Sequence, residues 1–174
     1  VLYTWAGPEI AVATTKAYST QLVLLDMLGV YFAKVCGSIG DAEYEEIVEE
    51  LLALPVKMEA VLEDIDEIKY LASRYFNHNS IFFIGRNLDY ALGLEGSLKL
   101  KEISYIHSEA YASGELKHGT ISLIEDGTLV VALGTYKPLF EKTLSNIIEV
   151  KARGADIVAL TAESKAADMR KTAE

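Results

Sequence analysis

The chain has 174 residues, of which 51% are hydrophobic and 24% charged, and its formal net charge is −10. This balance is typical of a folded globular protein, and the lack of a basic stripe argues against a nucleic acid as partner. Its single cysteine, Cys36, cannot form a disulfide within the chain, which favours a reducing compartment such as the cytoplasm.

Residues 1–40 are predicted to end in a long apolar helix. The apolar run 22–35 contains Asp26 and Lys34 and is shorter than the roughly 20 residues that span a bilayer, so we interpret it as a core helix and expect no membrane association. Thr14 or Thr15 is a candidate N-cap of this helix. Because the chain begins without methionine and ends in a polar run, we interpret it as an excised fragment.

Residues 41–76 have apolar positions at helical spacing and many carboxylates, which is typical of surface helices. Asp41 is expected to begin one helix, and Pro55 is expected to begin the next, which runs to about Phe76. We interpret this segment as a helical connector that leads into a following domain.

Residues 77–174 alternate between apolar runs and helical patterns. Three short runs predict buried strands: 80–84, 128–134 and 156–161. Helices are predicted between them, one around Glu95 and one from Pro138 to Arg153. This order predicts an α/β fold with a parallel sheet and right-handed crossovers.

The helix around residues 95–103 carries the clearest functional signal. Glu95, Lys99 and Glu102 stand at i, i+4 and i+7, so they share one stripe that leucines flank. An ordinary surface helix separates its charges from its apolar side, whereas this one mixes them, which favours a ligand cleft. The alternative is a plain salt bridge between Glu95 and Lys99 on a partly solvated face, worth about 0.3 kcal/mol.

The segment 114–119 places Lys117 and His118 between two glycines. A neutral imidazole can accept and donate a proton near pH 7, so His118 is a candidate proton carrier. A lone histidine is more commonly a surface or structural residue. The catalytic interpretation of His118 therefore depends on the charged helix that precedes it in the sequence. No Gly-x-Gly-x-x-Gly spacing follows Gly85, which argues against dinucleotide binding, and we expect no cofactor and no metal.

Two long runs carry a resemblance to a known family: AGPEIAVATTKAYSTQ at 6–21 and LEGSLKLKEISYIHSEAYASGELKHG at 94–119. In the same order, both resemble the isomerase region of the glucosamine-6-phosphate synthases, which are glutamine:fructose-6-phosphate aminotransferases with sugar isomerase (SIS) domains. The resemblance implies a three-layer α/β/α sandwich around a parallel sheet. It further implies that 77–174 is a second, C-terminally truncated SIS domain, that 1–40 is the helical remnant of a first SIS lobe, and that 41–76 connects them.

The chemistry that the resemblance implies makes glucosamine-6-phosphate from fructose-6-phosphate and glutamine by ring opening, imine formation and C1/C2 proton transfer. In the matching motif, Glu102 would be the base that moves the proton between C1 and C2. Lys99 would stabilise the developing negative charge, and Glu95 would orient the open-chain sugar. His118 would assist ring opening in the neighbouring subunit's site of a homodimer.

Val12 and Thr14 match positions that contact the sugar, although a helix cap explains Thr14 equally well. Thr120 stands where the family usually has proline. The family's phosphate-binding loop, Schiff-base lysine and glutaminase domain would lie outside this chain, so we expect the fragment itself to be inactive. Two alternatives remain: a sugar-phosphate isomerase or deglycase without a glutaminase, and a regulatory module that binds a sugar phosphate.

Overall fold

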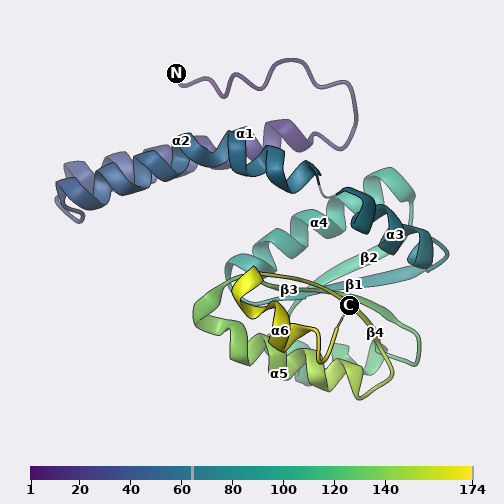
Figure 1. Ribbon diagram of the computed structural model, residues 1–174. Helices are drawn as coiled ribbons and strands as arrows, with labels where there is room; N and C mark the ends of the chain where they lie inside the picture. The colour runs from purple at the N-terminus through teal and green to yellow at the C-terminus, as the bar shows by residue number, and fades with distance from the viewer. Residues whose placement is uncertain (64, 174) are drawn as a thin grey trace. The chain divides into compact units, whose positions relative to one another are not determined.

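The computed structural model describes residues 1–63 and 65–173 (Figure 1). The chain divides into two compact units, Val1–Arg74 and Tyr75–Glu174. Each unit has its own internal contacts and is described separately below. Within the described ranges, no helix combines the length and the apolar composition that a bilayer crossing requires.

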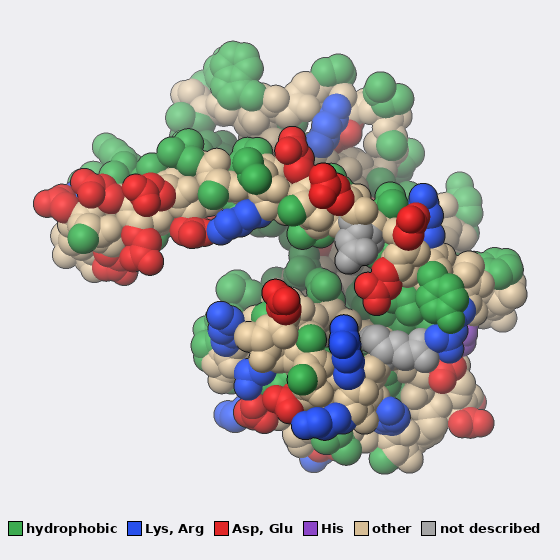
Figure 2. Space-filling view, in the orientation of Figure 1, with side chains coloured by type: hydrophobic (Ala, Val, Ile, Leu, Met, Phe, Trp, Pro, Cys, Tyr) green, Lys and Arg blue, Asp and Glu red, His purple; other side chains and the backbone are tan. Residues whose placement is uncertain are grey.

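The first unit consists of an extended segment and helices. Residues 1–14 lead into α1 (Thr15–Val35), which is followed by α2 (Asp41–Glu63) and α3 (Ile65–Tyr75). None of the described residues of these three helices is fully buried. Figure 2 shows carboxylates gathered on the first turns of α2, at the left of the view, where the helix sequence begins DAEYEEIVEE.

The predicted helix start at Pro55 is wrong, because α2 continues through this proline. Proline lacks a backbone N–H and disturbs one helical hydrogen bond. The residues on both sides, such as Leu51, Leu52 and Ala60, are good helix formers, and the remaining hydrogen bonds keep the helix continuous.

Thr14 occupies the position before α1 but does not cap the helix with its side chain, so the predicted capping hydrogen bond is not formed. Its backbone is left-handed, with φ 55°, and its hydroxyl donates to the carbonyl of Val12 at 2.6 Å. The carboxylate of Glu9 accepts instead from the backbone N–H of Ala17, in the first turn of α1, at 2.9 Å. A carboxylate at this end also interacts favourably with the helix dipole.

The second unit is an α/β domain whose strands are all parallel. The elements are β1 (Ser80–Gly85), α4 (Leu88–Ser104), β2 (His107–Ala112), β3 (Leu129–Gly134), α5 (Phe140–Lys151), β4 (Asp156–Thr161) and α6 (Ala166–Met169). The sheet order is β2-β1-β3-β4. Helix α4 covers one face and α5 and α6 cover the other, so the predicted three-layer α/β/α sandwich is confirmed (Figure 1).

Strand β2 was not expected from the sequence. Its sequence, HSEAYA, is mostly polar, and only Ser108 in it is fully buried. This composition fits its place at the edge of the sheet, where one side of the strand has no neighbouring strand within the described residues. Strand β2 lacks the continuous apolar run by which buried parallel strands are identified, although the other edge strand, β4, has one.

The hydrophobic core lies between the sheet and α5. Ile84 of β1, Val130 and Ala132 of β3, and Phe140 and Ile147 of α5 are all almost fully buried in one cluster. The strand register brings the carboxyl ends of β1, β2, β3 and β4 to the same edge of the sheet. The loops after these strands therefore lie where parallel sheets bind ligands.

Adjacent isoleucines of α5 test the position of this core. Ile147 is 0% exposed and Ile148 is 52% exposed. Replacing Ile147 with alanine leaves a cavity and should lower the free energy of unfolding by about 2–5 kcal/mol. The Ile148→Ala control should change it by about 0.5 kcal/mol or less. Urea unfolding followed by circular dichroism measures both, and equal losses would contradict the assigned core face.

Candidate active site

Helix α4 brings three of the predicted site residues together. Lys99 Nζ lies 2.8 Å from Glu102 Oε2 and 3.3 Å from Glu95 Oε1. The three side chains are partly buried, with exposed fractions of 20% for Lys99, 20% for Glu95 and 26% for Glu102. The salt bridge between Glu95 and Lys99 is thus present, and a shorter ion pair with Glu102 accompanies it.

The hydrogen bond to Glu102 raises the pKa of Lys99, and Glu95 adds a smaller contribution in the same direction, while desolvation opposes both. The ammonium is therefore stabilised in its charged form. The cluster as a whole has two carboxylates and one ammonium. It can accept hydrogen bonds from hydroxyl groups and can offer one positive charge to a developing anion.

The side of α4 that faces the sheet is small and polar. Ser108 Oγ of β2 donates to the carbonyl of Ser97 at 2.8 Å, and the two hydroxyl oxygens lie 3.1 Å apart. A Cβ on Gly93 would lie 3.6 Å from Phe83 Cβ, and one on Gly96 would lie 3.1 Å from Phe83 Cε1. The charged stripe is about 140–160° around the helix from Ser97, so it faces away from the sheet. Three leucines of α4 are 43–49% exposed: Leu92, Leu94 and Leu98.

The start of α4 is fixed by a buried carboxylate. Asp89 is 2% exposed, and its two oxygens accept from the Thr135 hydroxyl at 2.5 Å and from the backbone N–H groups of Thr135 and Tyr136 at 3.0 Å. A Cβ on Gly85 would lie 2.6 Å from the carbonyl carbon of Asp89, so glycine is required there. These contacts join α4 to the loop after β3.

His118 lies in a different part of the second unit. It ends the 3₁₀ segment Ser113–His118, which follows β2 directly. Its side chain is 77% exposed, and its Nε2 is 3.8 Å from Glu115 Oε2. Among the described residues, no hydrogen bond or ion pair connects His118 with Lys99 or Glu102. Lys117 instead forms an ion pair with Glu149 of α5 at 2.8 Å.

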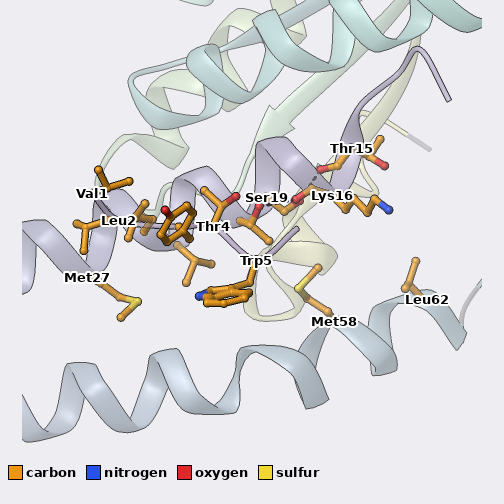
Figure 3. A pocket seen from close by; sticks show the side chains of 14 residues that line it. Val1, Leu2, Thr4, Trp5, Thr15, Lys16, Ser19, Met27, Met58 and Leu62 are labelled. Carbon is orange, nitrogen blue, oxygen red and sulfur yellow. Dashed lines mark hydrogen bonds between the residues drawn. The ribbon is translucent and has the colours of Figure 1, made fainter. Parts of the chain in front are cut away.

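Val12 and Thr14 lie in the first unit, just before α1, and contact each other through the hydroxyl-to-carbonyl hydrogen bond described above. Val12 is 78% exposed. The same unit contains a hollow of about 840 Å³ among the segment 1–5, α1 and α2. Trp5 and Met58 are among its mainly apolar lining residues, and the titratable side chains among them are those of Lys16 and Tyr3 (Figure 3).

Sequence reasoning missed Asp89 and the contacts of Arg86. Asp89 stands in the first turn of α4, where an acidic residue is common, but only the fold shows that it is buried. Arg86 Nε and Nη2 donate to Asn146 Oδ1 at 3.1 and 2.9 Å, across 60 residues of sequence. Among the described residues, no group of three or more His, Cys, Asp or Glu side chains could hold a metal ion.

Known proteins resemble this chain in sequence. It is 58% identical over 95% of its length to the isomerizing glutamine–fructose-6-phosphate aminotransferase of Clostridium tetani, and 47% identical over 94% of its length to that of Thermus thermophilus. The chain spans 27% of the length of each of these curated relatives. The resemblance carried by residues 6–21 and 94–119 is thereby confirmed.

Solved structures agree with the sequence relatives. The C-terminal domain of a glucosamine-fructose-6-phosphate aminotransferase from Francisella tularensis matches with a TM-score of 0.91 and 40% identity, over 94% of this chain and 46% of that one. A putative phosphosugar isomerase from Silicibacter pomeroyi matches with a TM-score of 0.74 and 28% identity, over 92% of this chain and 46% of that one. The SIS domain profile matches residues 74–172, and the chain belongs to the SIS domain family.

Proposed function

We propose that this chain is part of the isomerase region of an enzyme that makes glucosamine-6-phosphate from fructose-6-phosphate and glutamine. The observation that carries this proposal is the cluster on α4, in which one ammonium lies 2.8 and 3.3 Å from two carboxylates. A proton transfer between neighbouring sugar carbons needs a base and a fixed positive charge, and this cluster contains both.

Glu102 is the proposed base. Its carboxylate oxygens can take the proton from one carbon and return it to the next. Its exposed fraction of 26% leaves part of the side chain accessible to a substrate. The second carboxylate, Glu95, is the weaker partner of Lys99 and is free to accept hydrogen bonds from the open-chain sugar's hydroxyls.

Lys99 is the proposed electrostatic stabiliser of the enolate-like intermediate. Its raised pKa keeps it protonated, which suits a fixed positive charge. An amine that forms a Schiff base needs a lowered pKa, so the ion pairs argue against that role for Lys99. The stripe carries a net charge of −1, and it therefore suits the neutral part of the substrate better than its phosphate.

His118 is proposed to assist ring opening in the neighbouring subunit's site of a homodimer. An imidazole with 77% of its side chain exposed is accessible to a second subunit. Val12 is proposed to contact the sugar through its backbone, and Thr14 through its hydroxyl. The Thr14 hydroxyl would exchange its hydrogen bond to Val12 for one to the sugar.

The proposed domain organisation keeps the predicted boundaries. Residues 1–40 are the end of a first SIS lobe, 41–76 are a connector and 77–174 belong to a second SIS domain. The exposed, unpaired thiol of Cys36 fits a cytoplasmic protein. A sugar isomerase without a glutaminase is not favoured, because the relatives that are 58% identical are aminotransferases.

Glu102→Gln tests the proposed base in the protein expressed at the length of its aminotransferase relatives. The variant removes the proton acceptor but keeps the side-chain shape, so glucosamine-6-phosphate formation should fall by at least about 100-fold while fructose-6-phosphate still binds. Product is measured by mass spectrometry and binding by calorimetry. Glu141→Gln on α5 is the matched control, since it removes the ion pair between the exposed Glu141 carboxylate and Lys165. Unchanged turnover in the Glu102 variant, or no product from the native protein, would overturn the proposal.

The titration of Lys99 tests the electrostatic part. Glu102→Gln should lower the pKa of Lys99 toward its ordinary value, and Glu95→Gln should lower it less. The pKa of Lys99 is higher in the folded protein than in the unfolded chain. The ion pairs therefore stabilise the fold fully at pH values below the pKa of the unfolded lysine. This stabilisation is lost as the pH rises through the pKa of Lys99 in the folded protein. Nitrogen-detected NMR of the lysine ammonium groups measures the shift. Equal effects of the two variants would contradict the unequal roles of the carboxylates.

A further inference from the structure

A chain of four polar side chains joins the segment that carries His118 to the sheet and to α5. Arg86, directly after β1, donates two hydrogen bonds to Asn146 Oδ1 on α5, at 3.1 and 2.9 Å. Asn146 Nδ2 donates to Glu149 Oε2 at 3.3 Å. Glu149 Oε1 lies 2.8 Å from Lys117 Nζ. The last member of the chain is therefore the residue next to His118.

The same guanidinium also packs against the segment's backbone. A Cβ on Gly114 would lie 2.9 Å from Arg86 Nη2 and 3.0 Å from Nη1. Asn146 is 5% exposed, so the middle of the chain is buried. The segment 113–118 is thus held at both ends, by Arg86 at Gly114 and by Glu149 at Lys117.

Leu116, 1% exposed, fixes the middle of the segment in the hydrophobic core, whereas Lys117 and His118 after it are exposed and have no such packing. A 3₁₀ helix has poorer hydrogen-bond geometry than an α-helix, and this one has only six residues. His118 Nε2 lies 3.8 Å from Glu115, beyond hydrogen-bonding distance. The Lys117 ion pair, together with Asn146 and Arg86, lowers the pKa of Glu149, so its carboxylate stays charged at neutral pH.

We propose that Arg86, Asn146 and Glu149 are positioning residues that fix the backbone of Ser113–His118 and thereby the place of the His118 imidazole. This inference rests on the proposed function, because His118 is the group whose placement matters. None of the three residues needs to touch the substrate. Their effect on turnover acts through His118, which separates them from residues that only stabilise the fold.

The first test is a double-mutant cycle in the protein expressed at the length of its relatives. Glu149→Gln should lower kcat for glucosamine-6-phosphate formation about 10-fold and leave KM nearly unchanged, because a small misplacement of a catalytic group is costly. In a His118→Asn background, the same substitution should cause no further loss. Glu141→Gln, the same change on the same helix, should have no effect in either background. Additive losses, or equal effects of the two glutamate variants, would overturn the proposal.

The second test does not depend on activity. Hydrogen exchange of the backbone amides in 113–118 should be faster in Glu149→Gln than in the native protein, and unchanged in Glu141→Gln. Lys117→Met removes the same ion pair from its exposed side and should reproduce the faster exchange if Glu149→Gln does not fold. If the native protein is inactive, the proposed function is wrong, but faster exchange would still support the proposal that Glu149 fixes the segment 113–118. Unchanged exchange in a folded variant would overturn that proposal, whatever the activity.

Discussion

The close approach of α4 to the sheet determines how the rest of the second unit is arranged. Gly93 and Gly96 bring the helix against Phe83, and Ser97 and Ser108 satisfy each other's hydroxyl groups between the two layers. At Gly93 and Gly96 a side chain would meet Phe83, so the helix approaches the sheet closely there. Glu95, Lys99 and Glu102 lie on the opposite side of the helix, where they remain partly exposed.

The sequence predicted the parts of this arrangement that depend on local pattern. Helical spacing placed Glu95, Lys99 and Glu102 on one stripe, and apolar runs identified β1, β3 and β4. The polar strand β2 gave no such signal, because its sequence HSEAYA contains no apolar run, whereas the other edge strand, β4, has one. Pro55 is typical of a helix start, but the neighbouring helix formers are sufficient to continue α2 through it.

Contacts between distant residues could not be predicted from local pattern. Asp89 meets Thr135 across 46 residues, and Arg86 meets Asn146 across 60. Glu9 replaces Thr14 in capping α1 because the chain between them folds back, which spacing alone does not indicate. In each case a polar group finds its partner only after the fold has brought two segments together, and buried polar groups require such partners.

The tight turn at Gly85 has a mechanical consequence for the charged cluster. Glu102 lies 14 residues beyond the first residue of α4, so the helix between them is about 21 Å long. Since Gly85 and Asp89 hold one end of this rod, a tilt of about 5° at the turn would move Glu102 by about 2 Å. The position of the Glu102 carboxylate therefore depends on the rigidity of the turn at Gly85, at the other end of α4.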